Sequence, residues 1–79
     1  MSETIVDSRG QQCPLPVLKL RKALLAVPAG ARVRLWATDA QARRDVPNFC
    51  AETGDRLIAQ HEADGVLVFL VERGPTATA

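Results

Sequence analysis

The sequence predicts a two-layer α+β sandwich with the element order βαβαββ: a four-stranded mixed sheet, strand order 1-2-4-3, with two helices on one face. The second predicted strand alternates apolar and polar residues, which is typical of a sheet covered on one side only. The last predicted strand is apolar from Val66 to Val71, which favours a central position in the sheet. Because strand–helix–strand crossovers are right-handed, both helices are expected on the same face.

The chain of 79 residues predicts one domain, residues 1–79, with a net charge of +1. So small a charge gives no overall attraction to nucleic acid or membrane surfaces, so any basic binding site must be local. No apolar run approaches the ~18 residues of a membrane span, and the acidic start of the chain is unlike a signal peptide. We therefore expect a cytoplasmic protein that binds neither membranes nor, directly, nucleic acid, and that is a monomer when free.

Residues 4–7 form a short segment rich in β-branched side chains, which predicts the first strand, and residues 8–10 favour a turn after it. The motif Cys13-Pro14-Leu15-Pro16 then predicts a helix start, because prolines in the first turn lose no internal hydrogen bond. Pro14 is expected at the first helical position and Cys13 at or beside the N-cap. Residues 28–30, Pro-Ala-Gly, are expected to stop this helix.

The apolar side of the first helix is predicted to cover about half of its circumference, at ~100° per residue. The residues expected on this side are Val17, Leu18, Leu20, Leu24, Leu25 and Val27. Arg21 falls within the same arc, so its stem should lie on apolar surface while its charge reaches outward. Lys19 and Lys22 should point away from the core.

Residues 31–38 alternate as a half-buried strand, with Arg32, Arg34 and Trp36 on the uncovered face. The second helix is predicted to begin with Asp45 as N-cap and Pro47 in its first turn, and to end at Gly54.

Cys50 falls on the core side of this second helix. Residues 57–62 and 66–72 form the last two strands, joined by a tight turn at Asp64-Gly65. The tail from residue 74 is expected to be disordered.

Cys13 is the candidate functional residue, because a helix start presents partial positive charge and unpaired amides to an anion. The prolines remove two of the four amides, so those of Leu15 and Val17 are expected to face the sulfur. Such sites lower a thiol pKa from ~8.5 to roughly 3.5–7.5, which makes the sulfur a nucleophile at neutral pH. The alternative is a small buried cysteine that only packs.

The motif Cys13-Pro14-Leu15-Pro16 resembles the Cys-Pro-x-Pro signature of the TusA/SirA-like sulfur carriers, and the resemblance extends from Ile5 to about Val71. The other residues that carry it are Asp7, Gly10, Arg21-Lys22, Gly30, Thr38-Asp39, Asp45-Val46-Pro47, Phe49-Cys50 and Gly54. The resemblance implies the fold given above, which this family shares with the C-terminal domain of translation initiation factor three.

The resemblance also implies a function, in which Cys13 accepts sulfur as a persulfide and relays it to an acceptor protein. Pro14 and Pro16 would support the helix start. The implied donor is a cysteine desulfurase or a rhodanese-like protein, and no cofactor or metal is needed. Family members supply tRNA thiolation or other sulfur-transfer pathways, as carriers rather than as independent catalysts. The histidine that usually follows the glycine ending the second helix is replaced here by Asp55.

A local basic rim for acidic partners is a second hypothesis, formed by Arg9, Arg21, Lys22, Arg43 and Arg44. A solvated surface without function is the alternative.

Two other functions stay open: a binding or regulatory module that uses the uncovered sheet face around Arg34 and Trp36, and a redox switch between Cys13 and Cys50. His61 as a base for Cys13 and a zinc site are weaker hypotheses, because neither has a supporting motif.

Overall fold

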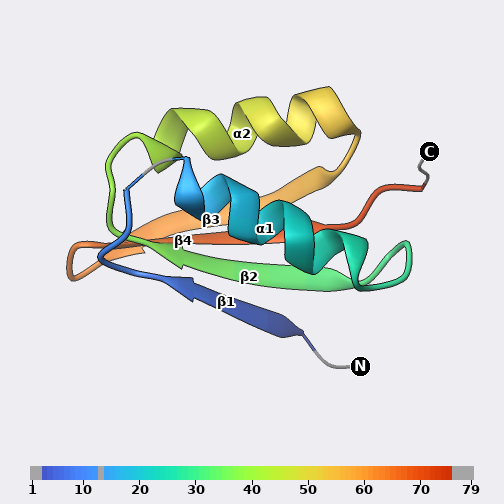
Figure 1. The fold of residues 1–79 in the computed structure, drawn as a ribbon, viewed down its shortest axis with the longest axis horizontal. Coiled ribbons are helices and arrows are strands. Elements are labelled where there is room, and N and C mark those ends of the chain that lie inside the picture. Colours follow the sequence, from blue (N-terminus) through green and yellow to red (C-terminus); the bar gives the residue numbers. More distant parts are fainter. Residues whose placement is uncertain (1–2, 13, 76–79) are drawn as a thin grey trace.

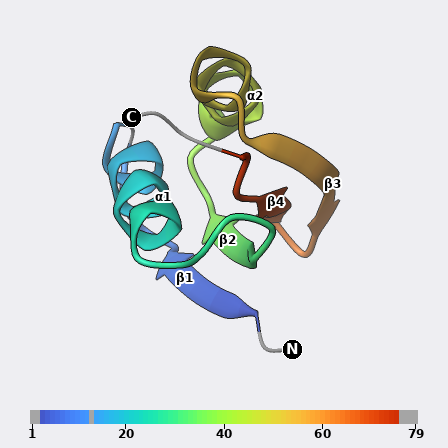
Figure 2. The same cartoon turned by 90° about the vertical axis from the view of Figure 1, so that its right-hand side faces the viewer.

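The computed structural model describes residues 3–12 and 14–75. Its sheet has the order β1-β2-β4-β3, with β1 parallel to β2 and the other neighbours antiparallel. Figures 1 and 2 show both helices on one face of the sheet, which confirms the predicted two-layer fold. The elements are β1 Thr4–Ser8, α1 Leu15–Leu25, β2 Arg32–Ala37, α2 Ala42–Thr53, β3 Arg56–Ala63 and β4 Val66–Glu72. Among the described residues, no helix has the length and apolar character needed to cross a bilayer.

The core lies between the helices and the two central strands. Alternate residues of β2, Val33, Leu35 and Ala37, are 0% exposed, as the alternation predicted. Leu67, Phe69 and Val71 of β4 are buried beside them, because antiparallel partners in register share a face. This arrangement confirms that β4 lies inside the sheet with one face covered.

Helix α1 begins one residue later than predicted and buries a narrower stripe. Pro14 is the N-cap rather than the first helical residue, and Pro16 is at the second helical position. Leu20 and Leu24 are buried, whereas Leu18 and Leu25 are 53% and 61% exposed. The prediction that these two leucines face the core is wrong. Only the side of α1 that contains Leu20 and Leu24 packs on the sheet, and nothing in the described chain covers the opposite side.

Helix α2 also differs at its start. It begins at Ala42, so Asp45 is not its N-cap and Pro47 lies inside the helix. Asp39 provides the cap-like contact instead, because its Oδ1 accepts a hydrogen bond from Gln41 N at 3.0 Å. Ala42 and Val46 are both 0% exposed, and their burial offsets the helix hydrogen bond that Pro47 cannot donate. Gly54 ends the helix in the left-handed region, with φ 85°, as predicted.

The β3–β4 hairpin turns at Asp64 and Gly65, with φ 53° and 78°, which confirms the predicted turn. Strand β3 extends one residue beyond its predicted bounds at each end.

Gly74 is buried, and its amide donates to Asp55 Oδ1 at 2.8 Å, so the chain is still packed where the tail was expected to begin. A Cβ at Gly74 would lie 2.2 Å from Gly54 O, which explains a glycine at this position. The rest of the expected tail, residues 76–79, lies outside the described residues.

Cys50 lies in the core on the inner side of α2 and is 4% exposed. Burial, with a smaller contribution from the Asp55 carboxylate, raises the pKa of the Cys50 thiol from 9.0 to about 11. The thiol is therefore neutral at physiological pH, where it behaves as a small apolar group.

We predict that Cys50 does not react with iodoacetamide at pH 8 in the native Cys13→Ser variant, and reacts readily in denaturant. Mass measurement of the modified protein checks this. Because the folded-state pKa is raised, the unfolded chain ionises first, so stability that is present below about pH 9 should be lost as the pH rises from about 9 to about 11. Rapid labelling of the native variant at pH 8 would contradict the burial of this thiol.

Candidate functional site

The candidate site is the connection between β1 and α1. Cys13 itself lies outside the described residues; in the sequence it directly precedes Pro14, the N-cap of α1. Pro14 is exposed and Leu15 is 46% exposed, whereas Pro16 is fully buried. The first turn of α1 is therefore anchored in the protein by Pro16 while its outer side meets solvent.

The backbone on both sides of Cys13 forms closed turns. Before it, Gln11 N donates to Ser8 O at 3.2 Å, and across it Leu15 N donates to Gln12 O at 3.0 Å. The prediction that the Leu15 amide faces an anion is therefore wrong, because the later start of the helix leaves this amide to close the turn. The role of the Val17 amide stays a prediction.

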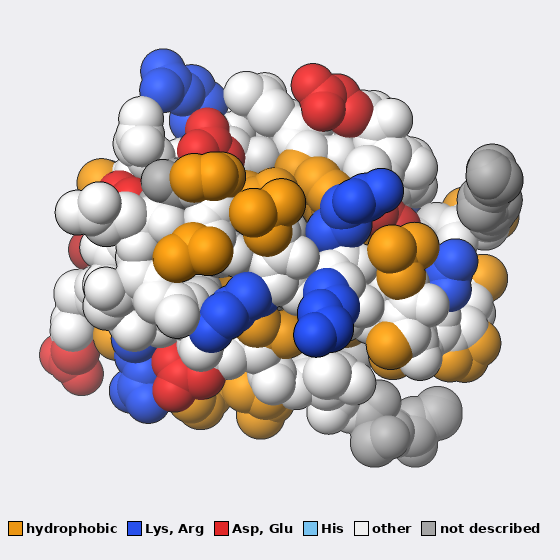
Figure 3. All heavy atoms as spheres, viewed as in Figure 1, with side chains coloured by type: hydrophobic (Ala, Val, Ile, Leu, Met, Phe, Trp, Pro, Cys, Tyr) orange, Lys and Arg blue, Asp and Glu red, His pale blue; other side chains and the backbone are white. Residues whose placement is uncertain are grey.

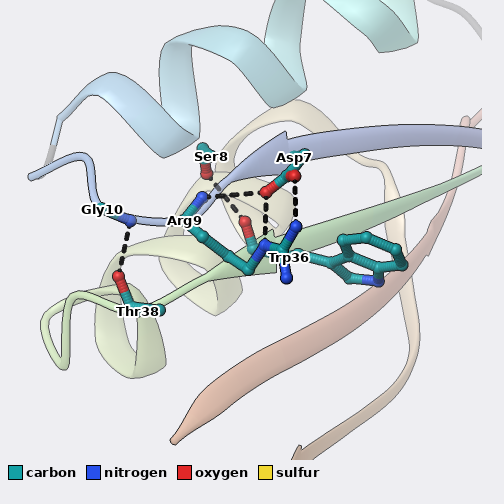
Figure 4. A network of polar contacts seen from close by, with 6 residues as sticks. All are labelled: Asp7, Ser8, Arg9, Gly10, Trp36 and Thr38. Carbon is teal, nitrogen blue, oxygen red and sulfur yellow. Dashed lines mark hydrogen bonds and ion pairs between the residues drawn. The ribbon is translucent and has the colours of Figure 1, made fainter.

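Two hydroxyl groups tie this connection to the end of β2 (Figure 4). Ser8 is 0% exposed, and its Oγ donates to Trp36 O at 2.9 Å. Gly10 N donates to Thr38 Oγ1 at 2.8 Å. Sequence reasoning had assigned no role to either hydroxyl. The only sequence signal was that Thr38 belongs to the residues that carry the family resemblance.

Arg9 is held by a carboxylate and an aromatic ring. Its Nε donates to Asp7 Oδ1 at 2.8 Å and its Nη2 to Asp7 Oδ2 at 2.7 Å. The guanidinium carbon lies 5.1 Å from the centre of the Trp36 ring. Figure 4 shows the two side chains next to each other. Hydrogen bonds from the Arg9 side chain and backbone lower the pKa of Asp7 to about 2. Arg9 is thus neutralised at the uncovered sheet face rather than beside α1.

The other predicted rim residues also differ in their surroundings. Arg43 forms an ion pair with Glu62 across α2 and β3. Arg21 and Lys22 on α1 and Arg44 on α2 are exposed and have no ion pair with the described residues. The predicted rim therefore separates into paired arginines and unpaired cations.

The face of α1 that meets solvent combines charge with apolar surface. In Figure 3, lysine and arginine side chains lie next to hydrophobic ones on this face. Leu15 and Leu18 are about half exposed there, and Arg21 and Lys22 follow within the next turn. This face adjoins the start of the helix, where the sequence places Cys13.

Two arginines of β2 on the uncovered sheet face are paired. Arg34 Nε donates to Glu3 Oε1 at 2.9 Å, and Arg32 lies 3.5 Å from Glu72. The hydrogen bond from Arg34 lowers the pKa of Glu3. Together with Arg9, these pairs offset the charge of three arginines on this face, whereas Arg56 of β3 has no ion pair with the described residues.

The remaining predicted residues lie away from the start of α1. His61 is exposed on the edge strand β3, paired in register with Val68. Asp55, where the family resemblance implies a histidine, accepts a hydrogen bond from Thr53 Oγ1 at 2.6 Å as well as the one from Gly74. It therefore joins the end of α2 to the end of the sheet. No three His, Cys, Asp or Glu side chains of the described residues are grouped as metal ligands would be.

The sequence matches a known protein family over most of its length. Residues 4–73 match the family described as sulfurtransferase TusA. The sulfur carrier protein TusA of Pseudomonas savastanoi pv. phaseolicola is 32% identical over 73 residues, which cover 92% of this chain and 87% of that protein. The protein of the same name from Pseudomonas entomophila is 34% identical over 71 residues, which cover 90% of this chain and 89% of that protein.

A solved structure has the same fold. The crystal structure of a SirA-like protein from Desulfitobacterium hafniense superposes with a TM-score of 0.81 at 27% sequence identity, covering 90% of this chain and 97% of that one. The family match spans every strand and helix described above, including the connection that contains Cys13. The chain therefore belongs to the TusA sulfurtransferase family.

Proposed function

We propose that this protein is a cytoplasmic sulfur carrier that holds sulfane sulfur as a persulfide on Cys13 and passes it to an acceptor protein. The observation that carries the proposal is the family match over residues 4–73, within which Cys13-Pro14-Leu15-Pro16 stands at the start of α1. The names of the two Pseudomonas relatives support the same role.

The chemistry is thiol exchange on sulfur, in two steps. The Cys13 thiolate attacks the terminal sulfur of a persulfide on the donor, a cysteine desulfurase or a rhodanese-like protein. A bond from Cys13 to that sulfur forms, the donor's S–S bond breaks, and the donor cysteine leaves as a thiolate. In the second step a thiolate of the acceptor attacks the terminal sulfur on Cys13, and Cys13 leaves as a thiolate. No electrons are lost or gained overall.

The described surroundings of position 13 suit such a relay. Pro14 and Pro16 restrict the backbone of the first turn, and the buried Pro16 fixes this turn to the protein. The positive end of the α1 dipole favours a thiolate over a thiol beside it. Exposed Leu15 and Leu18 offer apolar surface for a partner, and the nearby Arg21 and Lys22 favour a partner with an acidic surface.

The two alternatives from the sequence gain less support. A redox switch needs an accessible second thiol, whereas Cys50 is 4% exposed and its pKa is raised to about 11. A binding or regulatory module on the uncovered sheet face around Arg34 and Trp36 has fewer free cations to bind with, because Arg32 and Arg34 are paired with Glu72 and Glu3.

We predict that wild-type protein incubated with a cysteine desulfurase and cysteine gains the mass of one sulfur atom, and that Cys13→Ser gains none. Serine lacks the sulfur nucleophile and otherwise changes little. Cys50→Ala is the matched control and should load like the wild type, because its thiol is buried. Loading of Cys13→Ser at the wild-type level would remove Cys13 from the carrier role.

We further predict that the double variant Arg21→Glu, Lys22→Glu slows sulfur loading from the desulfurase about tenfold at low salt, because electrostatic complementarity acts mainly on association. Rates are measured by mass, and the difference should shrink as the ionic strength rises.

Arg56→Glu is the control for this variant. It reverses an exposed charge on β3, which is the edge strand opposite β1, whereas α1 packs against β1 and β2. Equal slowing by Arg56→Glu would show a general charge effect and contradict a docking role for the α1 cations.

A further inference from the structure

We propose that Thr38 is a positioning residue for Cys13; this inference rests on the proposed function. Thr38 directly follows β2, and its Oγ1 accepts the hydrogen bond from Gly10 N at 2.8 Å (Figure 4). Gly10 lies three residues before Cys13 in the chain. The contact therefore joins the segment that leads into Cys13 to the rigid central part of the sheet.

The Thr38 contact continues the pairing of β1 with β2 where the ladder stops. The parallel register ends at the pair Ser8 and Ala37. The next hydrogen bond of this ladder would run from Gly10 N to the backbone carbonyl of Thr38. The Thr38 side-chain hydroxyl accepts the hydrogen bond from Gly10 N instead. This substitution allows the backbone to turn at Gly10, whose φ of 81° is in the left-handed region, while the segment stays attached to the sheet.

The described backbone on either side of Cys13 is held by hydrogen bonds and by prolines. The turn from Ser8 to Gln11 and the turn from Gln12 to Leu15 are each closed by a backbone hydrogen bond. Beyond them, Pro14 and Pro16 have fixed φ angles, and Pro16 is buried. A shift of Gly10 therefore changes the position from which the described backbone leads into Cys13.

Thr38 differs from Ser8 in what its loss should cost. Ser8 is 0% exposed, so removing its hydroxyl leaves Trp36 O without that partner in the interior. Thr38 and Gly10 are exposed, so water can replace the lost hydrogen bond and the fold should tolerate the change. The Thr38 contact is therefore better suited to placing the segment than to holding the fold together.

The test compares three variants with the wild type. Thr38→Val keeps the shape and removes the acceptor, Thr38→Ser keeps the acceptor, and Thr4→Val makes the same change at the exposed start of β1. Three quantities are measured: the thermal unfolding midpoint, the pH midpoint of Cys13 alkylation by iodoacetamide, followed on the peptide that contains Cys13, and the rate of sulfur loading from a cysteine desulfurase.

We expect Thr38→Val to raise the pH midpoint of alkylation, because a less constrained thiolate spends less time at the helix start. Its loading rate should fall about tenfold, since misplacing a reacting group by ~1 Å can cost up to ~100-fold. Thr38→Ser should restore both values, and Thr4→Val should match the wild type. All variants should unfold near the wild-type temperature.

Wild-type alkylation and loading in Thr38→Val would overturn the proposal, as would failure of Thr38→Ser to restore them. Loss of the folded state in Thr38→Val would also overturn it, since the contact would then serve stability. The alkylation profile needs no sulfur donor. If the wild type takes up no sulfur on Cys13, the proposed function fails, while the pH midpoints still decide whether Thr38 places the thiol.

Discussion

The fold depends on burying one face of the sheet beneath two helices. The side chains that do this come mainly from β2 and β4, where Leu35 and Phe69 are 0% and 1% exposed, and each such burial contributes about 1.5–3 kcal/mol. Because these central strands provide most of the core, α1 needs to contribute only a narrow stripe around Leu20 and Leu24. Leu15, Leu18 and Leu25 of α1 are thereby left exposed to solvent.

Features that depend on local chemistry could be predicted from the sequence. The bounds of β4 match, because a run of apolar residues after Asp64-Gly65 has few other interpretations. The strand order followed from that same strand, since a strand apolar on both faces must lie inside the sheet. The exposed sides of Leu18 and Leu25 could not be predicted, because periodicity reports which residues share a side and not how much of that side the sheet can cover.

The start of α2 shows how tertiary packing overrides a local signal. Asp45 followed by Pro47 has the pattern of a helix N-terminus, yet the helix begins at Ala42. Ala42, Val46 and Cys50 are four residues apart and all face the core, so extending the helix buries one more apolar side chain. The N-cap is Gln41 without a side-chain cap, and the Asp39 carboxylate accepts the hydrogen bond of the Gln41 amide in a turn before the helix.

At the candidate site the sequence predicts which residue reacts, but it does not indicate which contacts hold the neighbouring backbone. The contacts of Ser8 with Trp36 and of Gly10 with Thr38 each join residues 28 positions apart, a separation at which no local pattern gives a signal. The same limit applies to charge. The arginines that look equivalent in the sequence divide into those with a carboxylate partner nearby in space, such as Arg9 and Arg43, and those with no ion pair among the described residues, such as Arg21.

This division of charge has a consequence for recognition. The paired arginines at the uncovered sheet face attract an acidic partner only weakly, because the carboxylates paired with them would repel that partner. Unpaired cations on α1 carry no such opposing charge from the described residues and lie beside exposed apolar side chains. For the proposed carrier, an acidic partner is therefore expected to favour the α1 face, which begins at Pro14, over the paired arginines of the uncovered sheet face.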